Sequence, residues 1–347
     1  PIGSFSEHGI SQSRVEIIVM RTPVVFVIFN RPDVSARVFA EIARARPRTL
    51  LVIADGPRSD HPLDVERCAS ARALIDRVNW DCEVLKNYSD INLGCGCRPA
   101  TGLSWVFDQV EEAIVLEDDC LPHPTFFRFC EEMLEKYRDD ERIMHISGDN
   151  FLPPRRQRFS YSFSSYCLSW GWATWRRAFQ HYDQGIKLWP TLRDSSWLSE
   201  ILGDPGAVTH WQRIFDRIYK QAGTSDVWDF QWLFTIWTRL GLAVLPNANL
   251  VSNIGFGEDA THTKGVKDKL ADLPLREMTF PLRHPRRVAR DQQTDQAIFE
   301  QLTGASRTAS YRQLRDRVIA ALRFYLAKSP LGRVVAPRGS EKGTVHS

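Results

Sequence analysis

Continuous apolar runs alternate with helical patterns over the first 150 residues. The first run, "PVVFVIFN" at 23–30, ends in a polar residue and is typical of a strand buried on both faces. The next segment, 31–46, places Val34, Val38 and Ile42 at helical spacing behind Asp33, a candidate N-cap. The pattern repeats, and it predicts strands at 49–55, 82–87, 113–118 and 142–150 and helices near 63–78, 99–110 and 124–137.

This alternation predicts an α/β fold with a mostly parallel, Rossmann-like sheet and helices on both faces, because parallel neighbours need crossover connections. Ligands of such sheets bind beyond the carboxyl ends of the strands. Polar residues stand at the ends of four consecutive predicted strands, namely Asn30-Arg31, Asp55-Gly56, Asn92-Leu93-Gly94 and Glu117-Asp118-Asp119. We therefore expect the binding site to lie along this rim.

The pattern changes after residue 150. The stretch "SYCLSWGWATWRRAFQHYD" at 165–183 is rich in tryptophan, and a Gly-rich loop, "NIGFGEDATHTKG", follows at 253–265. Between them we expect helices near 194–203, 207–221 and 229–240 and a strand at 242–246. The Pro- and Arg-rich stretch 281–290 predicts a linker, and 309–328 predicts a basic amphipathic helix inside a tail that covers 281–347.

Composition is that of an ordinary globular protein, with 43% hydrophobic and 25% charged residues among 347. No apolar run approaches the roughly 18 to 20 residues that span a bilayer. The seven cysteines are odd in number and scattered, which predicts reduced thiols in a cytoplasmic protein. Residues 1–21 are polar and without pattern until Met20, so we expect a disordered leader there.

Charge is distributed unevenly along the chain. Residues 281–347 contain thirteen Lys or Arg against five Asp or Glu, a net charge of +8, which leaves −5 for residues 1–280 because the whole chain carries +3. The acidic body argues against a nucleic-acid-binding protein. The basic tail is compatible with a helix packed on the body or with peripheral contact to a membrane surface through 309–328.

The triplet Glu117-Asp118-Asp119 carries the most chemical information. Three adjacent carboxylates repel one another and raise each other's pKa unless a cation neutralises them. Mg²⁺ or Mn²⁺ suits such ligands, and either ion takes one or two protein carboxylates and shares its other positions with water and substrate phosphates. The alternative is structural, because Asp119 could also cap a helix that begins near Pro122.

Several segments together resemble bacterial glycosyltransferases of the GT-A fold, and within them the N-acetylglucosaminyltransferase I type. The segments are "VFVIFNRPD", "VIADGPR", "NLGC", "AIVLEDDCLPHPTFFRFCEEML", "IMHISGDN", "WGWATWRRAF" and "NIGFGEDATHT". The resemblance covers about 22–265, and it implies a nucleotide-sugar-binding half at 22–150 and an acceptor-side half of the same domain at 151–280.

The resemblance also implies roles for individual residues. Asp119 corresponds to a metal ligand, and Asp229 in "VWDFQW" to the general base. The matching segment in the family is Trp-Asp-Asp-Trp, so Asp226 and Glu258 stay open as rivals to Asp229. The positions that resemble donor contacts are Asn30, Arg31, Asp55, Gly56, Glu117, Asp118 and His262, the last also a potential metal or phosphate contact. Arg98 is open to two interpretations, a phosphate contact or a solvated side chain.

The tryptophans at 170, 172 and 175 suggest sugar stacking, since an aromatic face with a polar edge suits a pyranose ring. We expect Trp172 with Gly171 to line the sugar site. The alternative is that Trp172 and Trp175, at i and i+3, form the core face of one helix. His145 in "IMHIS" is expected to be a core residue of its strand.

These observations predict a metal-dependent glycosyltransferase that uses Mn²⁺ or Mg²⁺. It would move a sugar from a nucleotide-diphosphate donor, with a UDP-sugar favoured, to a hydroxyl of a glycan or glycolipid, and the resemblance implies inversion at the anomeric carbon. Two alternatives stay open. A sugar nucleotidyltransferase also combines a parallel sheet, carboxylates and Mg²⁺, although "FNRPD" lacks the Gly-rich phosphate loop expected after its first strand. The other is a non-catalytic protein that binds a nucleotide-sugar or glycan.

Overall fold

A computed structural model describes residues 20–304, except 154–157, 222–223, 257–269 and 271. Its first half contains strands β1 (Val24–Ile28), β2 (Thr49–Ala54), β3 (Glu83–Tyr88), β4 (Glu112–Glu117), β5 (Cys120–Pro122) and β6 (Ile143–Ser147). Between them lie α1 (Pro32–Ala45), α2 (Leu63–Ala73), the 3-10 helix η1 (Leu74–Arg77), α3 (Gly94–Gln109) and α4 (Thr125–Lys136). The strand and helix alternation predicted for this half is confirmed.

The second half adds shorter elements. Its strands are β7 (Tyr161–Ser164), β8 (Trp172–Trp175), β9 (Leu242–Pro246) and β10 (Val251–Asn253). Its helices are α5 (Arg176–Phe179), α6 (Trp189–Leu192), α7 (Trp197–Leu202), α8 (Pro205–Lys220), α9 (Asp229–Thr238) and α10 (Gln292–Thr303). Residues up to Asp295 form one compact unit, and the chain from Gln296 onward belongs to a second.

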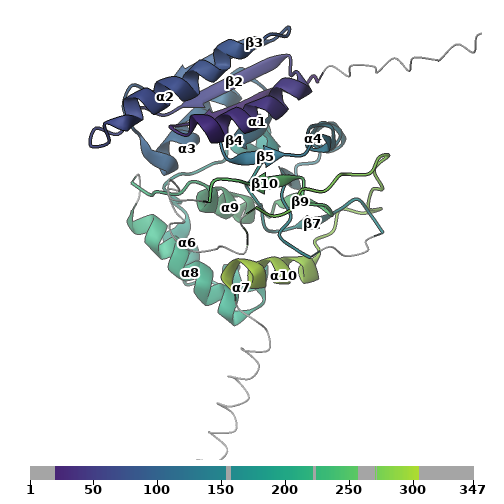
Figure 1. The fold of residues 1–347 in the computed structure, drawn as a ribbon. Helices are drawn as coiled ribbons and strands as arrows, with labels where there is room; N and C mark the ends of the chain where they lie inside the picture. The colour runs from purple at the N-terminus through teal and green to yellow at the C-terminus, as the bar shows by residue number, and fades with distance from the viewer. Residues whose placement is uncertain (1–19, 154–157, 222–223, 257–269, 271, 305–347) are drawn as a thin grey trace, which may run out of the picture. The chain divides into compact units, whose positions relative to one another are not determined.

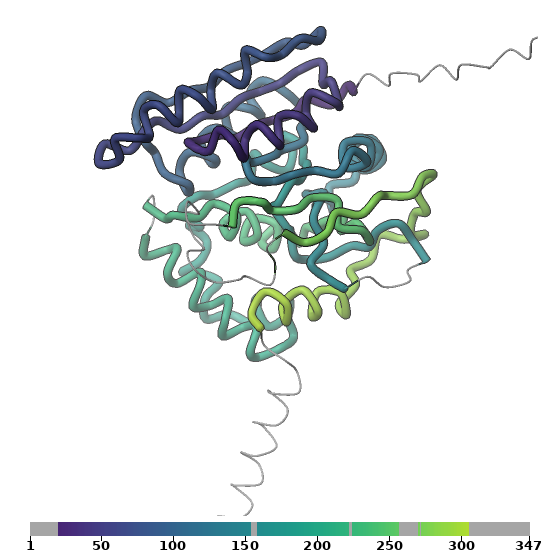
Figure 2. Tube along the Cα trace, in the orientation of Figure 1, coloured from purple at the N-terminus to yellow at the C-terminus, as the bar shows by residue number. Residues whose placement is uncertain are grey.

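The described strands form an eight-stranded sheet in the order β3-β2-β1-β4-β8-β6-β9-β7 and a small antiparallel pair, β10-β5. The pairs β1–β2, β2–β3 and β1–β4 are parallel, as the alternation predicted. β8 runs antiparallel to both β4 and β6, so it joins the parallel half to the later strands. Figure 2 shows this division, with the early strands in purple and blue on one side and the later ones in teal and green on the other.

Helices cover both faces of the parallel half. Val24, Phe26 and Leu50 point toward one face and share a core with Val38 of α1 and Ile75 of η1. Figure 1 shows α1 and α2 lying along the strands on this side. On the other face α3 approaches β2 so closely that a Cβ at Gly102 would lie 2.5 Å from the Ile53 side chain. The α/β fold class with helices on both faces is therefore established.

Trp172 and Trp175 do not lie on a helix. They begin and end β8, which pairs with β4 and β6, and both side chains are buried. In a strand, residues i and i+3 point to opposite faces of the sheet, and both can be buried when both faces are covered. The helical alternative was therefore wrong. His145 is fully buried in β6, as expected.

The segment 281–290 is bound to the edge strand β7, so its interpretation as a linker was wrong. The backbone N–H of Ser160 donates to the carbonyl of Arg283 at 2.8 Å, and the N–H of Asp291 donates to the carbonyl of Phe163 at 2.8 Å. Phe163 and Arg290 form a parallel bridge. Covering an edge strand removes a row of unpaired backbone groups that could otherwise pair with another chain.

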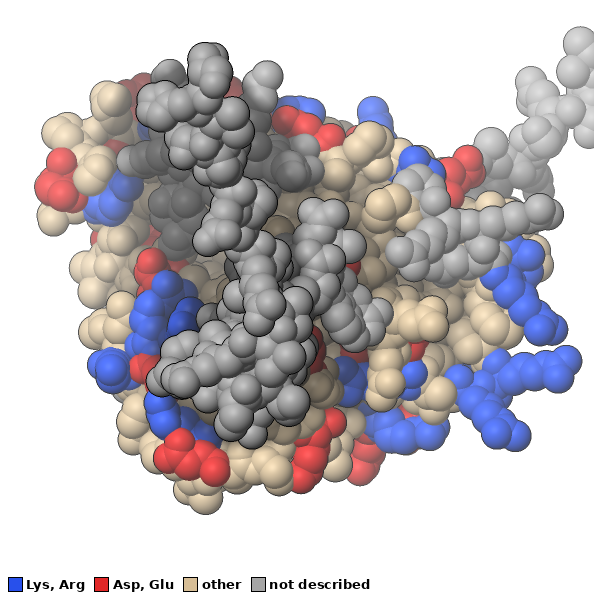
Figure 3. All heavy atoms as spheres, turned by 90° about the horizontal axis from the view of Figure 1, so that it is seen from below, with Lys and Arg blue, Asp and Glu red and all other residues tan. Residues whose placement is uncertain are grey.

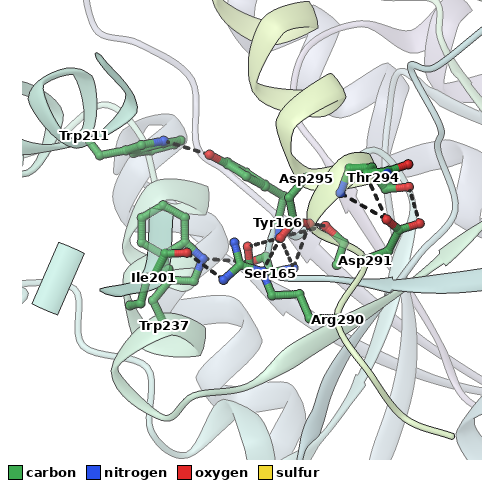
Figure 4. A network of polar contacts seen from close by, with 11 residues as sticks. Ser165, Tyr166, Ile201, Trp211, Trp237, Arg290, Asp291, Thr294 and Asp295 are labelled. Atoms are coloured by element: carbon green, nitrogen blue, oxygen red, sulfur yellow. Dashed lines mark hydrogen bonds and ion pairs between the residues drawn. The ribbon is translucent and has the colours of Figure 1, made fainter. Parts of the chain in front are cut away.

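Asp295 fastens this segment to the end of β7 (Figure 4). Its buried carboxylate accepts hydrogen bonds from Ser164 Oγ at 2.6 Å and Ser165 Oγ at 2.7 Å, and it pairs with Arg290. Arg290 Nη1 in turn donates to the carbonyl of Ile201 at 2.6 Å. One carboxylate thus joins β7, the covering segment and, through Arg290, the end of α7.

The described surface carries charges of both signs. The face in Figure 3 shows Lys and Arg side chains on both sides of the view, with Asp and Glu interspersed among them and among uncharged residues. In the part of the chain that the structure describes, no helix combines the length and the apolar character that crossing a membrane requires. The basic segment 309–328 and residues 1–19 of the predicted leader 1–21 lie outside the described residues. Met20 is buried and the backbone N–H of Arg21 donates to Glu131 Oε1 at 2.9 Å, so the prediction of disorder was wrong for these two residues.

We expect Asp295→Ala to lower the free energy of unfolding by about 3 kcal/mol, because it leaves Arg290 and two buried hydroxyls without their acceptor. Urea denaturation would measure this. Asp194→Ala is the matched control, since the Asp194 side chain is 81% exposed beside Arg193 and its loss should change stability by no more than about 0.5 kcal/mol. Equal losses in the two variants would contradict a fastening role for Asp295.

Candidate active site at the carboxyl ends of the strands

Arg31 is paired with two carboxylates of the triplet. β1 and β4 are parallel neighbours, with Val27 opposite Glu117, so the residues that follow both strands meet at one rim. Arg31 Nη2 donates to Asp118 Oδ1 and, at 3.0 Å, to Asp119 Oδ2. The three side chains are 18%, 5% and 14% exposed, respectively, so this ion-pair cluster is largely screened from water.

Negative charge still exceeds positive charge at this rim. Burial raises the pKa of Asp118 while the charge of Arg31 lowers it, and the net shift is upward. Burial, together with the charges of Asp119, Asp118 and Asp229, raises the pKa of Glu117 to about 8. Burial lowers the pKa of Arg31, but the two carboxylates more than offset that effect and hold the arginine charged.

Asp229 lies near this cluster although 110 residues separate it from Asp119. It is the first residue of α9, where its Oδ1 accepts a hydrogen bond from the backbone N–H of Phe230 at 3.0 Å. Its charge contributes to the raised pKa of Glu117 and also raises the pKa of Cys167 and Tyr182. The structure therefore brings the predicted base and the triplet into one electrostatic neighbourhood.

Gly255 touches Asp119 and Arg31, and the sequence analysis did not single it out. The backbone N–H of Ile254 donates to the carbonyl of Asp119 at 2.8 Å. A Cβ at Gly255 would lie 2.2 Å from Asp119 Oδ2 and 2.7 Å from Arg31 Nη1. Only glycine lets the chain after β10 pass this close to the two side chains. The Gly-rich stretch "NIGFG" was the sequence feature from which such a close approach could have been predicted.

Asp55 and Gly56 hold two loops together. Asp55 accepts hydrogen bonds from the backbone N–H groups of Leu93 and Gly94, both at 2.9 Å, and from Asn92 Nδ2 at 3.1 Å. Its carboxylate thus accepts hydrogen bonds from backbone N–H groups at the start of α3. These bonds lower the pKa of Asp55, but burial outweighs them and the net shift is upward. A Cβ at Gly56 would lie 2.5 Å from the backbone of Ile91, so this position also requires glycine.

The side chains of Asn30 and Arg98, like that of Asp55, form hydrogen bonds to neighbouring parts of the chain. Asn30 Nδ2 donates to Asp64 Oδ1 at 2.6 Å, and Asp64 also pairs with Arg58 at 2.6 Å. Arg98 is buried, and its Nε donates to the carbonyl of Ala54 at 3.0 Å while its Nη2 donates to Asn87 Oδ1 at 2.6 Å. The solvated alternative for Arg98 is therefore wrong, and Asp64 is a buried rim residue that the sequence analysis did not identify.

Trp172 does not offer an exposed stacking face. It is fully buried, its ring is stacked with His145 at 5.1 Å and with Trp228 at 5.5 Å between centroids, and its role as an exposed sugar platform is thereby corrected. Gly171, with φ of +67°, adopts a backbone conformation that favours glycine. A Cβ at Gly171 would also lie 2.6 Å from Val251.

Two predicted residues fall outside the described part of the chain, namely His262 and the rival base Glu258. Asp226, the other rival, is exposed, and its backbone carbonyl accepts a hydrogen bond from the Cys95 thiol at 3.0 Å.

Asp119 fits a hard divalent cation that takes most of its ligands from outside the protein. Its Oδ2 faces Arg31, and its Oδ1 accepts, within the described part of the chain, a weak contact from the Cys120 thiol at 3.5 Å. Among the described residues, no three His, Cys, Asp or Glu side chains are arranged to hold a metal. One or two carboxylates with water and phosphate suffice for Mg²⁺ or Mn²⁺, so the donor set is compatible with either ion.

Comparisons with known proteins give only weak likenesses. No family model and no curated protein matches the chain. A UDP-glucose pyrophosphorylase complexed with UDP-glucose matches with a TM-score of 0.26 and 12% identity over 43% of this chain and 65% of that one. The inositol-1-phosphate CTP transferase from T. maritima matches with a TM-score of 0.28 and 7% identity over 46% and 73%.

A third solved structure is glucosyl-3-phosphoglycerate synthase from Mycobacterium tuberculosis in complex with Mn²⁺, UDP and phosphoglyceric acid. It matches with a TM-score of 0.28 and 15% identity over 50% of this chain and 65% of that one. The chain thus spans a little under two thirds of the pyrophosphorylase and of the synthase. At these TM-scores the likenesses carry no argument about activity, which has to come from the site itself.

We expect Arg31→Met to lower the free energy of unfolding by about 3 to 5 kcal/mol, because it leaves buried Asp118 without its cation. Added Mn²⁺ should restore part of this loss if Asp119 binds the ion. Arg44→Met is the control, since Arg44 is 71% exposed in its pair with Glu41 and should contribute no more than about 1 kcal/mol. Urea denaturation with and without Mn²⁺ would test both points, and equal losses in the two variants would contradict the cluster's importance.

Proposed function

We propose that this protein is a metal-dependent glycosyltransferase that moves a sugar from a nucleotide-diphosphate donor to a hydroxyl acceptor. The observation that carries the proposal is the meeting of Arg31, Asp118 and Asp119 with Glu117 and Asp229 at the ligand-binding rim of an α/β sheet. Asp118, Asp119 and Asp229 outnumber the one paired arginine, and Glu117, whose pKa is raised to about 8, ionises near neutral pH only when further positive charge arrives. A divalent cation and its diphosphate partner suit such a site.

Asp119 is the residue that would hold Mn²⁺ or Mg²⁺ in this proposal. When bound, the ion supplies charge neutralisation for the diphosphate that leaves during transfer. Arg31 already contacts Asp119, so it is placed to exchange part of that contact for a phosphate oxygen. Asp118, which is held by Arg31 and by the backbone N–H of Phe29 at 3.4 Å, keeps the arginine oriented toward the rim.

Asp229 is the proposed general base. Its carboxylate takes the proton of the acceptor hydroxyl as that oxygen bonds to the anomeric carbon, while the bond from that carbon to the diphosphate oxygen breaks. The nucleoside diphosphate leaves with the electron pair. A single base on the face opposite the leaving group predicts inversion. The pKa of Glu117 is raised both by Asp119 and by Asp229. We propose that Glu117 contacts the donor.

The remaining assignments rest on the sequence. We propose a UDP-sugar as donor and a glycan or glycolipid as acceptor, with Asn30, Asp55, Gly56, Arg98, Gly171 and His262 shaping or contacting the donor side. For Asn30, Asp55 and Arg98 the described contacts support a shaping role, since their polar atoms bind neighbouring loops and strand ends. Cytoplasmic residence and membrane contact through 309–328 belong to the same proposal.

We expect Asp119→Ala to abolish sugar transfer and the Mn²⁺-dependent part of donor binding, because the proposed ion loses its protein ligand. Product analysis by ion-exchange chromatography should show nucleoside diphosphate from the wild-type protein. Pyrophosphate would instead indicate a nucleotidyltransferase, and donor binding without any product would indicate a non-catalytic binding protein. Asp108→Ala, at an exposed position of α3, should retain full activity. Unaltered turnover in Asp119→Ala would refute the metal assignment.

For Asp229→Asn we expect the catalytic rate to fall by about 10² to 10⁴, because the amide cannot accept the acceptor's proton. The dissociation constant for the donor should stay within about twofold, since the variant preserves shape and removes a group that acts on the acceptor. Single-turnover kinetics and calorimetry on the same preparation separate these effects. A collapse of donor affinity would show that Asp229 is not the base.

A further inference from the structure

Three aromatic side chains form a cluster that is partly exposed beside the rim. The ring of Trp170 lies 4.9 Å from that of Phe151 and 5.7 Å from that of Phe256, at interplanar angles of 62° and 77°. Phe151 is buried, whereas Trp170 and Phe256 are partly exposed. Edge-to-face contacts of this kind are typical of packed aromatics, so the cluster alone does not indicate a ligand.

The carboxyl group of Asp149 distinguishes this place from ordinary core packing. Asp149 is fully buried, and neither carboxyl oxygen makes a hydrogen bond to any described residue. Burial raises the pKa of Asp149 well above the ordinary value, although the backbone N–H groups of Asp149 and Trp170 lie close enough to lower it in part. Neither N–H reaches a carboxyl oxygen with the geometry of a full hydrogen bond. A buried polar group without a partner costs roughly 1 to 3 kcal/mol, so its presence requires an explanation.

The backbone on both sides of Asp149 is fixed. The N–H of Gly148 donates to the carbonyl of Gly171 at 2.7 Å, and the carbonyl of Gly148 accepts from Leu250 at 2.9 Å. The N–H of Asn150 donates to Asn249 Oδ1 at 2.9 Å, and Asn150 Nδ2 donates to the carbonyl of Pro246 at 2.7 Å. The position of the carboxyl group is therefore built by the fold and is not the product of a loose loop.

Asp149 and the aromatic cluster also adjoin the catalytic candidates. Phe256 follows Gly255, whose backbone abuts Asp119 and Arg31. The charge of Asp149 raises the pKa of Cys120, next to Asp119, and of Cys167, whose pKa Asp229 also raises. Asp149 thus shares an electrostatic neighbourhood with Cys120, next to the proposed metal ligand, and with Cys167, which the proposed base also affects.

We propose that Asp149, Phe151, Trp170 and Phe256 form a pyranose-binding subsite. The C–H face of the sugar ring packs on Trp170 and Phe256, and a ring hydroxyl hydrogen-bonds to the carboxyl group of Asp149. Phe151 supports Trp170 from the buried side. Because Asp149 is fully buried, the hydroxyl reaches it only when neighbouring side chains move, and in this proposal those of Trp170 and Phe256 do so.

This inference rests on the proposed function only for the source of the pyranose, which is either the donor or the acceptor. Isothermal titration in the presence of Mn²⁺ with three kinds of probe separates them. The probes are UDP, a panel of UDP-hexoses, and methyl pyranosides of the same sugars. The variants are Asp149→Ala, Asp149→Asn and Trp170→Ala, with Tyr219→Ala as control because Tyr219 is 42% exposed on α8 and belongs to no part of the site.

We expect Asp149→Ala and Trp170→Ala to leave UDP affinity within about twofold and to weaken the sugar-bearing probes by about tenfold, the loss expected for one hydrogen bond or stacking contact. Asp149→Asn should retain part of the affinity, because an amide still hydrogen-bonds to a hydroxyl. Asp149→Ala should not lower the unfolding temperature, since the carboxyl group makes no hydrogen bond of full geometry to a described residue. A purely structural role predicts the reverse, with lost stability and unchanged sugar binding.

The outcomes are distinguishable. A selective loss for UDP-hexoses assigns the subsite to the donor, and a selective loss for methyl pyranosides assigns it to the acceptor. If the wild-type protein binds no UDP but binds a methyl pyranoside through Asp149 and Trp170, the proposed function fails and the subsite stands. The inference is overturned if no sugar-bearing probe binds better than UDP alone and no pyranoside binds, or if the variants affect UDP and the sugar-bearing probes equally.

Discussion

The pairing of Arg31 with Asp118 and Asp119 is the interaction on which the rest of the rim depends. It connects Arg31, in the connection between β1 and α1, with the turn after β4, and these are neighbouring parallel strands of the sheet. Two carboxylates this poorly exposed would repel each other without a cation. The arginine makes their proximity tolerable, and Gly255 then lets the chain after β10 close against the pair.

Around this pair the polar residues at the strand ends divide into two groups. Asp55, Asn30 and Arg98 bind neighbouring backbone and side chains, so they fix the loops after β1, β2 and β3. Glu117 and Asp119 stand beside Arg31, and Asp229 joins them from α9. The first group supplies rigidity and the second supplies charge. The proposed diphosphate site would require both, because its contacts must be held in place before the ligand arrives.

The parallel half of the fold could be predicted from the sequence, because its buried strands appear as continuous apolar runs and its helices as apolar residues at helical spacing. β8 could not be recognised in that way, since Trp172 and Trp175 are buried on both sides of the sheet and their spacing fits a helix equally well. The triplet and Arg31 were found because strand ends converge. The contact between them, the approach of Gly255 and the burial of Asp149 arise from tertiary packing, which local patterns do not encode.

Asp118 and Asp149 are both buried carboxyl groups, but they differ in their hydrogen-bonding partners. Asp118 receives a guanidinium and a backbone N–H, so folding itself satisfies its charge. Neither carboxyl oxygen of Asp149 makes a hydrogen bond of full geometry to a described residue, although its flanking backbone is fixed on both sides. A group that were only structural would be replaced at little cost by an apolar residue of similar size. In the proposed subsite, a hydroxyl of the ligand completes the hydrogen bonding of this carboxyl group beside the aromatic cluster.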